Sequence, residues 1–195
     1  MALEWLALAR RAMQEFGSRV DAVTDWEAPT PDTEWDVADL VRHVVVEQQW
    51  IPPLLSGLTL AEAGDRVRPL GADLAAEWHR FAGLAAAAWE VAPPAAPVHL
   101  SYGTVTVEHY LREQVSDITI HSWDLARAAG LDETLDPTLV EAVWEVLDAQ
   151  REMLSASGLF AAPVEVSVDA PLQTRLLALT GRDADSTRRT DPTGG

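Results

Sequence analysis

The chain has 195 residues, of which 48% are apolar, so it is long enough for one domain with a sizeable core and short for two. Its 14 basic residues, all arginines, stand against 31 acidic ones, and the net charge of −17 disfavours binding to nucleic acid or to an anionic membrane surface. Cysteine is absent, which excludes disulfides, thiolate metal ligands and a cysteine nucleophile.

The first two elements along the chain are amphipathic helices. Residues 2–23 place apolar side chains three and four positions apart, as on one face of a helix. No signal peptide is recognisable at their start, and no run of about 18 apolar residues occurs anywhere, so we expect a cytoplasmic protein with no membrane partner. A second helix follows Asp36, an N-cap, with Trp35 packing on Leu40, and Pro52 and Pro53 should kink or end it.

The rest of the chain alternates helices with breaks rich in proline and glycine. We expect a connector over 57–71, a helix over 73–91, a short strand or extended loop over 98–104, and a helix over 107–129 between a Thr106 cap and Gly130. A further helix should run from Asp136 to near Gly158, followed by an extended stretch over 160–168 and a short helix over 171–179. Residues 1–181 thus form one domain, and the polar segment 182–195 should be a mobile tail.

Asp117 and His121 are the most informative pair in the sequence. Four residues apart on a helix, their side chains lie on one face and can bind a single ion. A carboxylate near the core is costly unless it is paired or coordinating, which favours a metal site. His43, at the edge of the apolar stripe of its own helix, is the best third ligand, and three N/O donors suit Zn²⁺ or Ni²⁺.

Other readings of these residues stay open. A lone buried histidine is more often a hydrogen-bonded core residue than a ligand, and Glu47 is a fourth ligand, a base or simply a solvated charge. The helical wheel places Trp123 on the far side of its helix from His121. We expect surface or interhelical hydrogen bonds for the remaining histidines, His79, His99 and His109. No phosphate loop, serine-hydrolase elbow or zincin motif is present, and no catalytic residue is identifiable.

Three stretches carry a family resemblance. They are Trp-Asp-Val-Ala-Asp-Leu-Val-Arg-His at 35–43, Asp-Ile-Thr-Ile-His-Ser-Trp-Asp-Leu-Ala-Arg-Ala-Ala-Gly at 117–130, and Ala-Pro-Leu-Gln-Thr-Arg-Leu-Leu-Ala-Leu-Thr-Gly-Arg at 170–182. Together they resemble the actinobacterial metal-binding branch of the DinB-like superfamily, which is similar to the N-terminal domain of mycothiol-dependent maleylpyruvate isomerase. The resemblance implies an all-α, up-down-down-up four-helix bundle with a divalent ion bound by His43, Asp117 and His121. Asp117 stands where the isomerase has glutamate.

The same resemblance implies a function. A divalent ion with an open position would lower the pKa of a low-molecular-weight thiol, mycothiol, for S-transfer to or isomerisation of a small electrophile. The alternative is a non-catalytic protein that binds a metal or a small ligand. The expected partners are small molecules, and a homodimer is compatible with either function.

Overall fold

Four long helices build the body of the molecule: α1 (Ala2–Asp21), α2 (Val37–Leu55), α4 (Leu74–Val91) and α5 (Val107–Ala128). A short helix, α3 (Leu60–Gly64), lies in the connector after α2, and two strands, β1 (Pro97–Leu100) and β2 (Gly103–Thr106), separate α4 from α5. Two more helices follow, α6 (Pro137–Ala149) and α8 (Leu172–Leu179). This computed structural model describes residues 2–31, 34–151 and 161–185.

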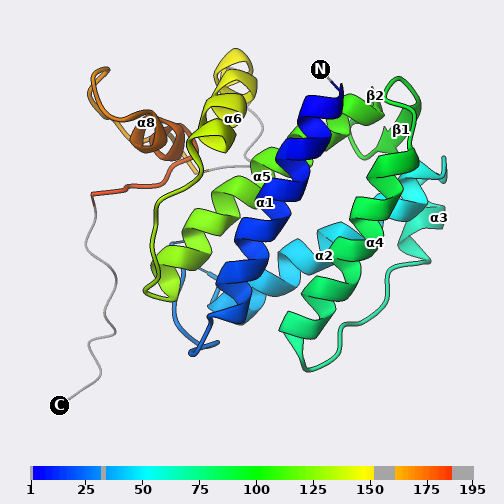
Figure 1. The fold of residues 1–195 in the computed structure, drawn as a ribbon, viewed down its shortest axis with the longest axis horizontal. Helices are drawn as coiled ribbons and strands as arrows, with labels where there is room; N and C mark the ends of the chain where they lie inside the picture. The colour runs from blue at the N-terminus through cyan, green and yellow to red at the C-terminus, as the bar shows by residue number, and fades with distance from the viewer. Residues whose placement is uncertain (1, 32–33, 152–160, 186–195) are drawn as a thin grey trace.

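The four long helices form an up-down-down-up bundle, as predicted. In Figure 1, α1 and α5 run in one direction while α2 and α4 run in the other. The closest packing is between α1 and α5 and between α2 and α4. Two parallel consecutive helices need a connection that returns along the bundle, and residues 56–73, with α3 at their start, provide it. The all-α class with a short β segment is therefore confirmed.

Side-chain caps fix where most of the helices begin. Asp36, Asp73, Thr106 and Asp136 each accept a hydrogen bond from a backbone amide in the first turn of α2, α4, α5 and α6. Such a cap satisfies an amide that has no partner within the helix. The predicted caps at Asp36, Thr106 and Asp136 are confirmed.

Two predicted boundaries differ from the structure. The helix α2 continues through Pro52 and Pro53 and ends at Leu55. Neither proline has an amide to donate to the carbonyl four residues earlier, and the helix stops two residues after them. Gln49, one turn earlier, is held by two hydrogen bonds between its side-chain amide and the backbone of Arg68, which fasten the connector to α2. At the other end of the chain, α6 ends at Ala149 instead of near Gly158, and residues 152–160 lie outside the described part.

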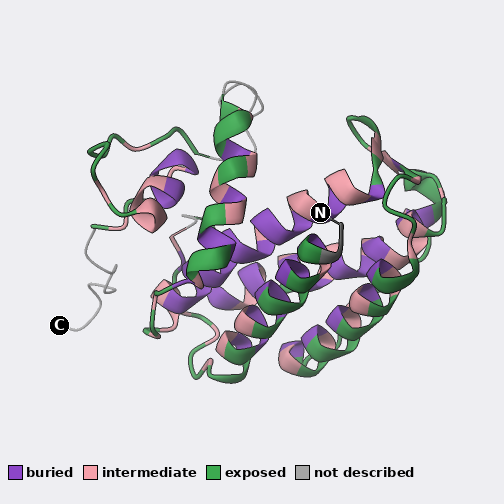
Figure 2. Ribbon diagram, turned by 45° about the horizontal axis from the view of Figure 1, so that its top comes forward, coloured by how far each residue is buried: buried purple, intermediate pink, exposed green. Residues whose placement is uncertain are grey.

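The core fills the space between the four long helices. Figure 2 shows buried and exposed residues alternating along α1 and α4, whereas α5 is buried over most of its length. Phe16 of α1 and Trp78 of α4 are among its largest members, with ring centroids 4.7 Å apart. The helices α6 and α8 pack on each other beside α5, outside the bundle. Within the described ranges, no helix has the length and apolar character needed to cross a membrane.

The segment after α8 packs against the bundle for at least a few residues. Arg182 is largely buried and forms an ion pair with Asp124 of α5, and Arg127 donates to the carbonyl oxygens of Asp183 and Ala184. A polar sequence can thus be held by polar partners as well as by apolar area, and the domain boundary at Gly181 stays a prediction. The rest of the expected tail, 186–195, lies outside the described residues.

Candidate metal centre

The helix α5 contributes two of the predicted ligands from one face. His121 is buried, with 6% of its surface exposed, and Asp117 one turn before it is half-buried. The Nε2 atom of His121 lies 3.4 Å from Oδ1 of Asp117. The spacing of four residues, in a helix capped by Thr106 and continuous through both positions, produces this approach.

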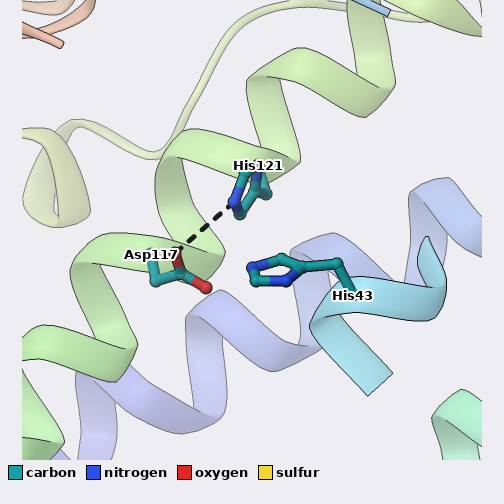
Figure 3. Close-up of side chains that lie close together, drawn as sticks. All are labelled: His43, Asp117 and His121. Atoms are coloured by element: carbon teal, nitrogen blue, oxygen red, sulfur yellow. Dashed lines mark ion pairs between the residues drawn. The ribbon is translucent and has the colours of Figure 1, made fainter. Parts of the chain in front are cut away.

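The third predicted ligand comes from α2. His43 is half-buried, and its ring centroid lies 5.2 Å from that of His121, with the two rings nearly perpendicular. Figure 3 shows the carboxylate of Asp117 and the two rings turned toward one another from α5 and α2. Trp35 covers the two rings, with its centroid 4.9 Å from His43 and 6.1 Å from His121. Its place beside both histidines was not predicted.

The spacing of the donor atoms suits a metal ion. One donor atom from each of His43, Asp117 and His121 lies within 4.8 Å of the others. Two donors bound to zinc at about 2.0–2.1 Å in tetrahedral geometry lie roughly 3.3 Å apart, close to the separation of Asp117 and His121. The Oδ2 atom of Asp117 is buried and has no hydrogen-bond partner among the described residues. A bound cation would satisfy this oxygen, because buried polar atoms normally have a partner.

The charges of the centre are strongly coupled. Burial lowers the pKa of His121, but the adjacent carboxylates of Asp117 and Asp124 outweigh it and raise that pKa to about 10. Burial likewise raises the pKa of Asp117, but the charge of His121 and the hydrogen bond between them, with His43 nearby, bring it below its ordinary value. At neutral pH the metal-free centre therefore holds a proton on His121 between two carboxylates.

Comparison with known proteins places the chain in a family. Residues 6–126, which include all three candidate ligands, match the family described as the mycothiol maleylpyruvate isomerase N-terminal domain. The chain belongs to this family. The family assignment and the bundle agree with the resemblance that the sequence carries.

Two protein sequences and two solved structures are also similar to the chain. Two uncharacterized proteins of Mycobacterium tuberculosis, MT0763 of strain CDC 1551 / Oshkosh and Rv0738 of strain ATCC 25618 / H37Rv, are each 32% identical over 113 residues. That match covers 57% of this chain and spans 58% of each relative's length. A crystal structure of the mycothiol-dependent maleylpyruvate isomerase shares the fold, with a TM-score of 0.72 and 17% identity over 95% of this chain and 91% of that one. The crystal structure of a histidine-to-alanine mutant of the mycothiol-dependent maleylpyruvate isomerase has a TM-score of 0.64 and 15% identity. That match covers 84% of this chain and 75% of the mutant chain.

In this member of the mycothiol maleylpyruvate isomerase N-terminal domain family, Asp124 contacts the ring nitrogen of His121 that faces away from Asp117. Asp124 is fully buried, and its Oδ2 lies 3.1 Å from Nδ1 of His121. The ionised carboxylate has no proton to give, so Nδ1–H donates and Nε2 faces Asp117. Arg182 reaches the same carboxylate, with Nη2 2.8 Å from Oδ2. Asp124 lies three residues after His121 on one helix face, a signal that sequence reasoning missed.

Glu47 lies one turn after His43 on α2 and is half-buried. Burial and the nearby charge of Asp117 raise the pKa of Glu47 to about 7, although Gln114 donates a hydrogen bond to it. Both protonation states of this carboxyl group are therefore populated at neutral pH. Of the three readings left open for Glu47, the raised pKa favours an acid–base role over a solvated charge.

The remaining histidines lie away from the centre, as predicted. His79 of α4 pairs with Asp21 of α1, His99 contacts Thr104 within the hairpin, and His109 pairs with Glu113 on the surface of α5. Trp123 of α5 is buried, and the guanidinium of Arg127 lies 4.3 Å from its ring centroid.

Metal affinity should rise with pH above neutrality because of the raised pKa of His121. An ion must displace the His121 proton, which is bound until the pH approaches about 10, so zinc affinity should increase about tenfold per pH unit between pH 6.5 and 8.5. The fold stability of the metal-free protein should change with pH in the opposite direction to zinc affinity, falling as pH rises. A raised histidine pKa stabilises the fold fully below its unfolded value of about 6.5, and this stability is lost as pH rises toward 10. Calorimetry in two buffers of different ionisation enthalpy should show about one proton released per zinc near pH 7.5, and equal heats in both buffers would contradict this.

Proposed function

We propose that this chain is a divalent-metal-dependent protein that activates a low-molecular-weight thiol, mycothiol, for transfer to, or isomerisation of, a small electrophile. The observation that carries the proposal is the convergence of His43, Asp117 and His121, with donor atoms within 4.8 Å, in a chain without cysteine. The chain has no thiol of its own, so any sulfur chemistry takes its sulfur from a cosubstrate. The family description and the solved isomerases support mycothiol as that cosubstrate.

The donor set supports Zn²⁺ or Ni²⁺ as the ion. Imidazole nitrogens are borderline ligands that suit zinc and nickel, and zinc also accepts carboxylate oxygen. Three protein ligands would leave a position open for substrate, as in catalytic rather than structural zinc sites. When bound there, the ion would lower the pKa of a thiol so that it reacts as a thiolate at neutral pH.

The chain's own residues supply the rest of the proposed chemistry. His43, Asp117 and His121 hold the ion, and Trp35 shields the histidine rings on one side. The carboxylate of Glu47, which lies one turn after His43 and is close enough to Asp117 and His121 for their charges to affect it, would accept the thiol proton; in the metal-free protein burial raises its pKa to about 7. The product of this step is a protonated Glu47 and a deprotonated thiol.

The electrophile is proposed only by class. The solved isomerases act on maleylpyruvate by name, but they share less than a fifth of their residues with this chain, which supports a common fold and no particular substrate. The second candidate function, left open by the sequence, is a non-catalytic protein that binds a metal or a small ligand through the same residues. A homodimer and a cytoplasmic location stay predictions.

Titration with mycothiol separates these functions. We expect zinc-loaded protein to bind mycothiol and metal-free protein not to, with a fall in affinity of at least about tenfold for S-methyl mycothiol, which cannot lose a thiol proton. Calorimetry measures the three affinities: mycothiol for zinc-loaded protein, mycothiol for metal-free protein, and S-methyl mycothiol for zinc-loaded protein. A panel of electrophiles then tests turnover by the zinc-loaded protein. Binding of mycothiol without turnover supports the non-catalytic function. Equal binding of mycothiol by metal-free and zinc-loaded protein would remove the thiol-activation mechanism.

A further inference from the structure

Asp124 is an unusual residue for the middle of α5. It is a carboxylate with 0% of its surface exposed, and its burial without compensation would cost several kcal/mol. Two cationic partners compensate it from two parts of the chain. His121 approaches from the metal centre at 3.1 Å, and Arg182 approaches from the segment after α8. Both contact the same oxygen, Oδ2, while Arg182 also reaches Oδ1 at 3.2 Å through Nε.

The end of α8 is built to deliver Arg182 to this position. The amide of Arg182 donates to the carbonyl of Leu177 and that of Gly181 to Ala178, the paired bonds that close a helix with a left-handed residue. Gly181 has a φ of 79°, and a Cβ there would lie 2.6 Å from the Cβ of Ala161. Only glycine fits this turn. The guanidinium is then fixed by a further bond from Nη1 to the carbonyl of Thr180 at 2.8 Å.

We propose that Arg182 is a positioning residue of the metal centre, acting through Asp124 on His121. The two guanidinium nitrogens of Arg182 that donate to Asp124 hold its carboxylate so that Oδ2 accepts from Nδ1–H of His121. That hydrogen bond fixes the imidazole ring of His121 so that its Nε2 points toward the other two ligands, Asp117 and His43. The segment after α8 thereby completes a centre whose ligands all come from α2 and α5. This inference rests on the proposed function.

A purely structural ion pair would be a weaker explanation of the same contacts. Replacing a buried ion pair by apolar side chains is often neutral or stabilising, so fold stability alone gives little reason for a buried Arg–Asp pair here. Outer carboxylates that accept from a ligating histidine, by contrast, set its tautomer and orientation, and their loss typically weakens metal binding 10- to 100-fold. The shared Oδ2 atom makes the orientation of Asp124 depend on both partners.

Arg127 offers a matched control for Arg182. Its side chain is equally buried, 11% against 10% exposed, and it binds the same segment through the carbonyls of Asp183 and Ala184. Its carboxylate partner, however, is Glu133 and not Asp124. Loss of either arginine loosens the segment, but only loss of Arg182 should disturb His121.

The test compares Arg182→Met and Arg127→Met in the full chain by two readouts. Zinc affinity, measured by competition with a chromogenic chelator, should weaken about tenfold or more in Arg182→Met and less than about twofold in Arg127→Met. In the metal-free protein, the hydrogen-bonded Nδ1–H proton resonance of His121 should be present in the wild type and in Arg127→Met and lost in Arg182→Met. Arg182→Lys, which keeps the charge but not the fork, should lie between the wild type and Arg182→Met.

The outcomes separate this inference from the proposed function. Equal affinity losses in the two methionine variants, or wild-type affinity and an unchanged Nδ1–H resonance in Arg182→Met, overturn the positioning role. If the wild type binds no zinc, the proposed function fails, while the resonance in metal-free protein still decides whether Arg182 orders His121. If Arg182→Met does not fold, Arg182→Lys and Arg127→Lys are compared by the same two measurements, zinc affinity and the Nδ1–H resonance of His121. Equal results in the two lysine variants then overturn the positioning role.

Discussion

Replacing His121 with glutamine should reduce zinc in the purified protein from about one ion per chain to a trace, because only two of the three donors remain. His121 contributes the most buried donor of the set, and its Nε2 lies 3.4 Å from the Asp117 carboxylate. The loss of affinity should exceed the roughly 100-fold that removal of an outer partner causes. Elemental analysis of protein prepared without an affinity tag, together with a chelator competition, measures the effect.

His109→Gln is the matched control for this change. His109 lies on the same helix and pairs with a carboxylate four residues away, Glu113, but on an exposed surface and without a third donor. Zinc content should stay at the wild-type level in this variant. A His121→Gln protein that still binds one zinc ion per chain would exclude the centre formed by His43, Asp117 and His121.

Removing residues 182–195 should destabilise the metal-free protein by about 3 kcal/mol, since it leaves Asp124 buried without its guanidinium. The figure is at the low end for a broken buried pair because the positive charge of His121 remains near Asp124 even where their hydrogen bond is no longer held in place. For a chain of this size it corresponds to a fall of roughly 6–12 °C in the melting temperature. Chemical denaturation followed by circular dichroism gives the free energy of unfolding directly.

The control is a shorter truncation, of residues 186–195, which keeps Arg182 and the carbonyls that accept from Arg127. Its sequence is polar and offers little apolar area to bury, so the melting temperature should change by no more than a few degrees. If both truncations leave the stability of the wild type intact, the contacts of Arg182 do not contribute to the fold. A matching loss in both would place the stabilising residues beyond 185.

Local signals explain why much of this fold was predictable. Helix caps, proline breaks and apolar periodicity depend on residues within a few positions of one another, and the starts of α2, α5 and α6 follow from Asp36, Thr106 and Asp136. The pairing of Asp117 with His121 is equally local, since it needs only the geometry of one helix. His43 joins them from another helix, and its partnership was inferred from its position on a stripe edge and from the family resemblance.

The contacts that sequence reasoning missed span longer distances or override a local rule. Arg182 and Asp124 are 58 residues apart, and the polar composition after Gly181 indicates exposure in the absence of a known buried partner. The helix α2 continues for two residues beyond Pro52 and Pro53, which the local rule against proline inside a helix does not predict. Trp35, just before the cap of α2, lies beside a histidine of α2 and a histidine of α5, and the periodicity of neither helix predicts this contact.

The dependence of Asp124 on Arg182 also has a consequence for biosynthesis. A ribosome makes the chain from its N-terminus, so all four bundle helices are synthesised before Arg182. Until that residue emerges, closing the bundle around Asp124 would bury a carboxylate with His121 as its sole cationic partner. A bundle that closes before the segment after α8 docks therefore carries the same cost, about 3 kcal/mol, that we expect for the truncated protein. In the proposed metal centre, the orientation of His121 would then be the last part to be fixed as the chain folds.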